Sequence, residues 1–379
     1  MKAIQGMILL LFCSAMLTGC WDQKAVQDIN IITAVGVDYI KDKYVVYGKL
    51  SDLSSVVASD SGGGTKKATS WVGRGEGPTV SLAFNDIYPS SQHQTLWTHV
   101  KSIVLTESAL QNLTDIFEEM LRSRDIRYTP WVFATKMPIE EIFNAETTFN
   151  QSPLKLLMFE PREVYKQHSA VEPVRLQKLM NAVREPATAI MLPDITLTTK
   201  HWKTNDKDNS MMELNGVFVV QQGVNKGWVS QEELSGARVV NFSHINRFPL
   251  NLDSSKGAPS SLSMHHANSS YQLNQKKGKL AIDVTVTVHA NITESAWKKG
   301  MDEKQMKMAA EQKLTRDILE NFTKTQMKGI DLYGFEEWFY RYHYKLWKQK
   351  SSGGPLLPDL EMGNVKVTVK IDHSNTYKM

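Results

Sequence analysis

The segment Leu17-Thr18-Gly19-Cys20, near the start of the 379-residue chain, offers the clearest chemistry in the sequence because it places a thiol directly after two small residues. It ends an apolar run that begins at Met7 and follows a single charged residue, Lys2. The run is far shorter than the roughly 20 helical residues that span a bilayer core. A charged start, a short apolar centre and small residues at the end are typical of a secretory signal.

Cys20 is a candidate for lipid attachment. The segment before it resembles the bacterial lipobox, in which the Cys thiol is alkylated with diacylglycerol and the signal is cut just before the Cys. We therefore expect residues 1–19 to be a lipoprotein signal peptide and Cys20 to begin the mature chain. One acyl chain such as palmitate anchors weakly, whereas the two chains of diacylglycerol anchor stably. The alternative is an ordinary secretory signal that contains a Cys.

Composition limits what the rest of the chain can do. The two cysteines are Cys13, inside the expected signal, and Cys20, so no thiol remains for a disulfide, a zinc site or a nucleophile. The 44 Lys and Arg nearly balance the 40 Asp and Glu, which does not favour a nucleic-acid partner. The slight positive excess suits an anionic membrane surface. No other run approaches about 18 apolar residues, so we expect no membrane-spanning segment in the mature chain.

Motifs for catalysis, phosphate binding and metal binding are missing or incomplete. The sequence has no Gly-X-Ser-X-Gly and no Gly-Lys-Ser or Gly-Lys-Thr. Residues 73–78 put Pro78 where a dinucleotide fingerprint needs its third glycine, so we expect a turn with Pro78 opening a helix to residue 87. The pair His265-His266 has no further ligand at suitable spacing, and its polar surroundings predict a loop. We expect no catalytic residue, no cofactor and no metal.

Three further groups have ordinary structural explanations. The adjacent carboxylates at 118–119 and 140–141 lie on predicted helical segments, where neighbouring side chains point apart into solvent. His99 is expected on the half-exposed face of a strand. None of these groups predicts acid or base chemistry.

The elements of the first half alternate between strands and helices. Strands are predicted at 29–38, 44–50, 68–72, 96–106 and 131–134. A helix capped by Thr106 is predicted from its buried face, Leu110, Leu113, Phe117, Met120 and Leu121. A second helix is expected over 171–184. This order predicts a βαβ-like unit and a mixed sheet.

The second half combines alternating strands with a long helix. Residues 280–288 and 365–371 alternate apolar and polar side chains, so we predict two strands that pair antiparallel in one sheet. Between them, 301–328 is predicted as a helix with one apolar stripe, Met306, Ala310, Leu314, Ile318 and Phe322. An aromatic-rich helix is expected to follow from Phe335 to Trp347. Its rings could pack a core or, in part, form a partner surface.

The chain is longer than a single hydrophobic core usually organises, so several domains are expected. The polar, turn-rich stretch at 200–212 is the best candidate linker. It divides the mature chain into an α/β domain at 20–199 and a second α/β region at 213–379, possibly of two subdomains. The predicted class is mixed α/β with mixed and antiparallel sheets.

The order of these segments resembles the Ger(x)C family, the lipoprotein subunits of spore germinant receptors. Gly19-Cys20-Trp21-Asp22 and the strand at 32–38 match the start of the family pattern, and Gly227-Trp228 before a short acidic helix matches its second region. The end of the pattern is matched by Asp331, Gly334, Trp347 and the strand at 365–369. Residues 23–28 differ from the Arg-Arg-Glu-Leu-Asn-Asp-like segment that is common in the family.

The resemblance implies α/β domains anchored by lipid on Cys20 at the outer face of the spore inner membrane. It implies a non-enzymatic subunit of a nutrient germinant receptor that acts in assembly or signalling during germination. Its partners are expected to be an A-type subunit and a permease-like B-type subunit, with no nucleic acid. Two alternatives remain: a solute-binding lipoprotein of an importer, which predicts two doubly wound lobes, and a lipid-anchored hydrolase.

Overall fold

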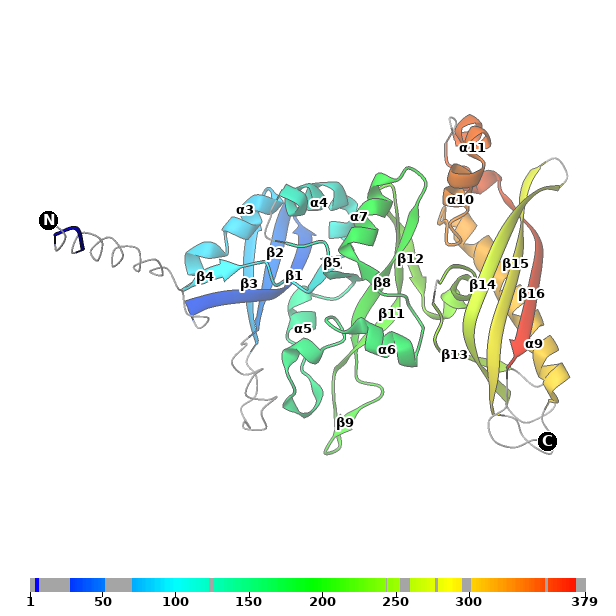
Figure 1. Cartoon of the computed structure of the whole chain (residues 1–379), viewed down its shortest axis with the longest axis horizontal. Helices are drawn as coiled ribbons and strands as arrows, with labels where there is room; N and C mark the ends of the chain where they lie inside the picture. Colours follow the sequence, from blue (N-terminus) through cyan, green and yellow to red (C-terminus); the bar gives the residue numbers. More distant parts are fainter. Residues whose placement is uncertain are drawn as a thin grey trace.

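The computed structural model describes residues 4–6, 28–51, 70–122, 126–242, 244–252, 260–276, 279–294, 301–351 and 354–372. Two bodies lie side by side along the long axis, each built on one large β-sheet (Figure 1). The predicted mixed α/β class is confirmed. Cys20 and nearly all of the expected signal peptide lie outside the described residues. Within the described ranges, every helix is too short or too polar to span a bilayer.

The first body contains a mixed sheet in the order β12-β11-β8-β6-β5-β1-β2-β3, with β4 beside β1 and β7 beside β6. The central pairs β1–β5, β5–β6 and β6–β8 are parallel, and the outer pairs are antiparallel. The strands are β1 Ile29–Ile40, β2 Lys43–Ser51, β3 Ser70–Gly77, β4 Gln94–Leu96, β5 Ser102–Thr106, β6 Trp131–Thr135, β7 Val174–Arg175, β8 Ala189–Thr198, β11 Met211–Gln221 and β12 Val224–Ser230.

Helices cover both faces of this sheet, with α3, α4 and α7 on one side and α5 on the other (Figure 1). Val35 and Val37 of β1 pack under the first group, whereas Ala34, just before them, packs with α5. Both faces of the strand are therefore buried, which explains its continuous apolar sequence. The helices are α3 Val80–Asn85, α4 Leu113–Arg122, α5 Ile139–Phe143, α6 Pro161–Gln167 and α7 Leu176–Arg184. Short 3₁₀ turns occupy η2 Tyr88–Ser90, η3 Ala109–Asn112, η4 Thr148–Asn150 and η5 Pro153–Lys155.

The prediction of a turn at residues 73–78 is wrong, because Gly73, Gly75 and Gly77 belong to β3. A Cβ added at Gly75 would lie 2.3 Å from the carbonyl oxygen of Ala83, and one at Gly77 would lie 2.7 Å from its nitrogen. The glycines are thus needed where the backbone of α3 crosses the strand closely. Helix α3 begins after Thr79, not at Pro78, and the Thr79 hydroxyl accepts from the Leu82 N–H.

Two other boundaries in the first body differ from expectation. The single strand predicted at 96–106 is split into β4 and β5 by a bend in which Trp97 is buried and His99 is exposed. His99 therefore lies outside a strand. The helix expected at 171–184 begins only at Leu176, because Val174 and Arg175 pair with β6.

Residues 200–212, the expected linker, contain a small hairpin of β9 Lys203–Thr204 and β10 Lys207–Asp208. The strands on either side of it, β8 and β11, pair with each other over ten positions in the first sheet. The expected boundary therefore does not coincide with the boundary between the two large sheets.

The second body has the sheet order β13-β14-β15-β16, with α9 packed along it (Figure 1). Its strands are β13 Phe248–Leu252, β14 Ser260–Lys276, β15 Lys279–Glu294 and β16 Glu361–Ile371. The prediction that the last two strands pair antiparallel is wrong, because β15 and β16 are parallel. The 25-residue helix α9, Glu303–Met327, carries the chain back along the sheet, so β16 runs in the direction of β15.

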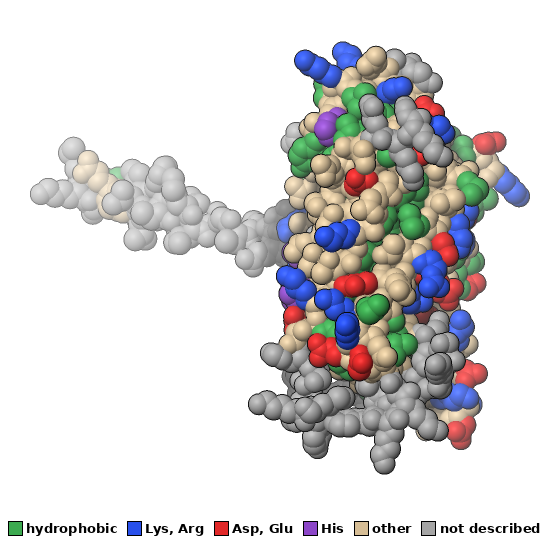
Figure 2. Space-filling model, turned by 90° about the vertical axis from the view of Figure 1, so that its right-hand side faces the viewer, with side chains coloured by type: hydrophobic (Ala, Val, Ile, Leu, Met, Phe, Trp, Pro, Cys, Tyr) green, Lys and Arg blue, Asp and Glu red, His purple; other side chains and the backbone are tan. Residues whose placement is uncertain are grey.

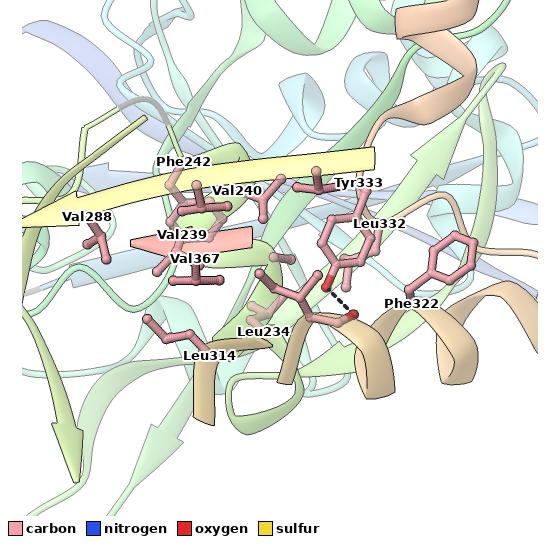
Figure 3. Packing of buried hydrophobic residues seen from close by; sticks show 14 of the residues in the cluster. Leu234, Val239, Val240, Phe242, Val288, Leu314, Phe322, Leu332, Tyr333 and Val367 are labelled. Atoms are coloured by element: carbon pink, nitrogen blue, oxygen red, sulfur yellow. Dashed lines mark hydrogen bonds between the residues drawn. The ribbon is translucent and has the colours of Figure 1, made fainter. Parts of the chain in front are cut away.

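The predicted stripe of α9 is confirmed: Met306, Ala310, Leu314, Ile318 and Phe322 are all buried in the core of the second body. Figure 3 shows part of this core, where the Tyr333 hydroxyl donates to the carbonyl oxygen of Ile318 over 3.0 Å. The remaining helical elements are η6 Glu232–Leu234, α8 Ser235–Asn241, α10 Phe335–Tyr342, α11 Tyr344–Ser351 and η7 Leu357–Asp359. The single aromatic helix that we expected is therefore two helices, which meet at His343.

Strand β11 contributes side chains to the hydrophobic cores of both bodies. On β11, Val217 and Val219 face the core of the second body, whereas Phe218 and Val220 face α7 and the core of the first. Because successive side chains of a strand point to opposite faces, β11 contributes to both bodies at once.

Candidate functional site

A cavity of about 510 Å³ lies between the two bodies. Its wall comes from α7 and β8 of the first body, and from α8, β14 and the 331–341 segment of the second. Concave sites between domains are common places for ligand binding and for transmission of movement. The cavity is therefore the candidate functional site of the described part of the chain.

The turn before α10 forms the buried wall of this cavity. The Asp331 carboxylate accepts the N–H groups of Phe335 and Glu336 over 3.0 and 2.8 Å. Gly334 adopts φ +66°, a left-handed conformation that glycine reaches without strain. The Asp-then-Gly order noted in the sequence therefore begins α10: the carboxylate satisfies the unpaired N–H groups of the first turn.

Burial dominates the electrostatics of Asp331. It raises the pKa of the Asp331 carboxyl to about 7, with a smaller rise from the neighbouring Glu336 and an opposing effect of the backbone N–H groups. Asp331 is thus a buried acid that titrates near neutrality.

Glu336 makes two buried hydrogen bonds, one of which links the two bodies. One carboxylate oxygen accepts from the Gln221 side-chain amide of β11 over 2.8 Å, and the other accepts the Leu357 N–H over 3.0 Å. Gln221 also donates to the carbonyl oxygen of Ala187 at 3.3 Å. The first sheet, α10 and the segment before β16 therefore meet at one carboxylate.

Tyr271 lies on the β14 side of the cavity. Its hydroxyl is 3.0 Å from Asn241 Oδ1 and 3.1 Å from the Tyr333 carbonyl oxygen. Asn241 in turn donates to the Leu332 carbonyl oxygen over 2.6 Å. These polar groups of the wall are hydrogen-bonded to one another, an arrangement that fixes the wall.

Ion pairs cross the rim of the cavity. The Arg341 guanidinium of α10 lies 3.0 Å from Glu185, just after α7, and 2.8 Å from Glu337 of its own helix. The first contact joins the two bodies at the surface. Exposed pairs of this kind contribute little stability.

A second polar contact joins the bodies through α8. Arg238 is almost completely buried, and its Nε donates to the Ala170 carbonyl oxygen over 3.0 Å. Its guanidinium also lies 4.0 Å from the ring centre of Phe248 on β13. Burial lowers the pKa of Arg238 to about 10.

Two family models match the chain, an N-terminal model followed by a C-terminal one. Residues 22–197 match the model described as "Spore germination protein N-terminal domain", and residues 215–375 match "Spore germination B3/ GerAC like, C-terminal". The second model begins within β11, so it includes β12 of the first sheet as well as the whole second sheet. The chain belongs to the Ger(x)C family of spore germination proteins.

Individual relatives of this Ger(x)C protein are distant but span most of its length. A Bacillus subtilis (strain 168) protein named YfkR is 22% identical over 344 residues, covering 89% of this chain and 88% of that protein. Spore germination protein KC of the same strain is 22% identical over 360 residues, covering 90% of this chain and 88% of that protein. The crystal structure of the GerBC protein has the same fold, with a TM-score of 0.53 at 13% identity over 89% of this chain and 97% of that one.

The structure also locates the groups that the sequence singled out. His265 and His266 lie in β14, so the predicted loop is wrong; His266 forms a bulge with φ +46°. His265 lies 3.0 Å from Asp372 and His289 lies 2.8 Å from it. The hydrogen bond from His289 is the main cause that lowers the pKa of Asp372. No group of three potential metal ligands was found among the described residues.

A shallower hollow lies at the carboxyl ends of the parallel strands, where α/β sheets commonly bind ligands. Asp38 at the end of β1 accepts from the Ser108 hydroxyl over 2.6 Å and from the Thr106 hydroxyl. Its carboxylate is thus used to connect β1 with the turn after β5. The Thr106 hydroxyl also accepts the Ala109 N–H, but the residue that precedes the 3₁₀ turn η3 is Ser108 and α4 begins only at Leu113, so Thr106 is not the cap residue that we predicted.

Sequence reasoning missed Glu336, Gln221 and Arg238 as contacts between the bodies. Arg238 is a charged residue among apolar neighbours, a signal that could have marked it as buried, whereas Glu336 is followed by Glu337 and has no such signal. Their partners lie 68 to 115 residues away along the chain and could not be read from local patterns.

Proposed function

We propose that this Ger(x)C protein is a lipid-anchored, non-catalytic subunit of a nutrient germinant receptor complex and serves assembly or signalling in spore germination. The observation that carries the proposal is that two germination family models match, in order, over nearly all of residues 22–375. The similarity to Spore germination protein KC over 90% of the chain supports the same role.

The proposed anchor is diacylglycerol on Cys20, with Leu17, Thr18 and Gly19 as the recognition sequence and residues 1–19 removed. Cys20 precedes the first described strand residue, Ile29, by fewer than ten residues, so the folded body would stay within about 30 Å of the membrane. The proposed location is the outer face of the spore inner membrane. The proposed partners are an A-type subunit and a permease-like B-type subunit.

The contacts between the two bodies support a signalling role. The packing of β11 into both cores and the Glu336–Gln221 hydrogen bond couple the sheets, so a partner bound to one body can influence the other. The chain is accordingly expected to move as a coupled unit when the receptor changes state.

The anchor is tested with a matched pair of cysteine variants. Cys20→Ser should abolish labelling by radioactive palmitate and either leave an uncut precursor or release the protein from spore membranes, with weakened germination. Cys13→Ser, a change in the same segment, should leave labelling, processing and membrane association unchanged. A Cys20→Ser protein that is still labelled, cut before residue 20 and retained on the membrane would disprove the anchor.

The complex is tested by affinity purification of the tagged chain from detergent-solubilised spore membranes. Recovery of a permease-like membrane protein together with an A-type subunit is expected. A solute-binding lipoprotein would instead co-purify with an importer permease and its ATPase, and neighbouring genes would encode them. That alternative also predicts two doubly wound lobes, whereas the second body here is a four-stranded sheet backed by one long helix.

A further inference from the structure

Helix α11 protrudes from the second body. It forms the end of the protrusion above the second body, beyond both sheets (Figure 1), and none of its residues is fully buried. Leu346 and Trp347 pack partly against the second core. The residues that point away, among them Tyr344, Lys345 and Lys348, are exposed. One side of the helix therefore packs against the second body, and the other side is exposed to solvent.

The solvent-exposed part of α11 is basic. Between Glu337 and Asp359 the sequence contains no acidic residue, whereas α11 carries Lys345, Lys348 and Lys350. None of the three pairs with a carboxylate among the residues that the structure describes. Figure 2 shows Lys and Arg side chains gathered at this end of the molecule. Such uncompensated charge favours an anionic partner.

The same helix exposes aromatic rings. Tyr344 is 50% exposed, and its ring lies 5.8 Å from that of Tyr340 and 6.0 Å from that of Trp347. Tyr342, at the end of α10, is 71% exposed. Tyrosine and tryptophan rings combined with long lysine side chains are typical of segments that lie in the interface between lipid and water.

We propose that α11 binds the surface of an anionic phospholipid membrane, with Lys345 and Lys348 of its solvent-exposed side and Lys350 of its exposed last turn contacting lipid phosphates, and Tyr344 entering the headgroup region. The proposed acyl anchor precedes β1 of the first body, whereas α11 lies on the second body (Figure 1). Two attachment points, one on each body, would lay the protein along the membrane, with α11 on the membrane side.

Sedimentation with vesicles tests the proposal. The full chain with Cys20→Ser, so that no acyl group contributes, is mixed with vesicles of phosphatidylcholine alone or with added phosphatidylglycerol. The readout is the ratio of binding to anionic and neutral vesicles, and it is compared between variants that share the same start of the chain. Binding should favour anionic vesicles and weaken as salt is raised.

The variant Lys345→Gln/Lys348→Gln/Lys350→Gln should lower that ratio by about 10- to 100-fold, since each lysine near an anionic surface contributes appreciably. The control Lys200→Gln/Lys203→Gln/Lys207→Gln removes the same charge from exposed positions in and beside the β9–β10 hairpin and should change the ratio less than about twofold. Tyr344→Ser should weaken binding without changing net charge. Circular dichroism checks that each variant is folded.

Equal losses in the two triple variants would overturn the proposal, because they would show a nonspecific effect of net charge. Equal binding of the parent chain to neutral and anionic vesicles would also overturn it. In that case α11 would be assigned to an acidic protein partner.

Discussion

Asp331 is a buried carboxyl whose position explains both a sequence motif and a pH dependence. It accepts two N–H groups at the start of α10, and burial raises its pKa from about 3.8 to about 7. Between these values the folded state binds more protons than the unfolded state, so the free energy of unfolding falls as pH rises. Below about pH 3.8 and above about pH 7, Asp331 makes no further contribution to the change of the free energy of unfolding with pH.

The pH dependence of unfolding tests this assignment. Asp331→Asn removes the titrating group and one N–H acceptor, so it should lower stability at pH 5 while flattening the decline in urea midpoint between pH 4 and pH 7. Asp42→Asn, at an exposed turn, should leave the decline as in the parent chain. An unchanged slope in Asp331→Asn would assign the titration to another group.

At the scale of elements, close backbone contacts decide where helices can lie. Gly75 and Gly77 let α3 approach β3, and Gly236 of α8 lies against the backbone of α9, where a Cβ would be 2.7 Å from the Cα of Ile318. These glycines are sites of contact between elements in the fold. They are not turns or phosphate-binding loops.

A pair of glycine substitutions tests the crossing of α3 and β3. Gly75→Ala places a methyl group 2.3 Å from the Ala83 carbonyl oxygen and should cost about 2–3 kcal/mol of unfolding free energy. Gly73→Ala meets its nearest neighbour, Ile87, at 3.4 Å and should cost less than about 0.5 kcal/mol. Chemical denaturation measures both, and equal costs would show that α3 can move away.

At the scale of the whole molecule, the two bodies are joined by apolar packing and by buried polar contacts. Val217, Val219 and Val229 of the first sheet pack into the second core. Glu336 and Arg238 add hydrogen bonds whose removal would leave buried groups without partners. The bodies are therefore expected to unfold together.

Substitution of adjacent glutamates tests this coupling. Glu336→Ala leaves the Gln221 amide with only its longer hydrogen bond to Ala187 and leaves the Leu357 N–H buried without an acceptor, and should cost about 3 kcal/mol. The Glu336→Ala change should also raise the rate of backbone amide hydrogen exchange in β11 and in residues 354–360. Glu337→Ala, which removes a half-exposed ion pair with Arg341, should cost less than about 1 kcal/mol. Similar effects of both changes would argue against Glu336 as the link.

Local patterns predicted most elements of this protein and the family to which it belongs. The α9 stripe and the alternation in β15 correctly identified buried faces, because a repeat of 3.6 or 2 residues is a property of the chain itself. The lipid attachment at Cys20 stays a prediction from sequence.

What local patterns could not decide were relations between distant segments. The parallel pairing of β15 with β16 depends on the path of α9, and the role of the glycines in β3 depends on where α3 crosses. The cavity, the burial of Asp331 and the Glu336–Gln221 link exist because two separately patterned bodies pack together. Sequence by itself determined most elements, the family and the expected anchor, because each of these depends on the types and spacing of residues that lie near one another in the chain. Tertiary structure alone decided the direction of β16 and the site between the bodies, because contacts between residues about 80 to 115 positions apart leave no local pattern.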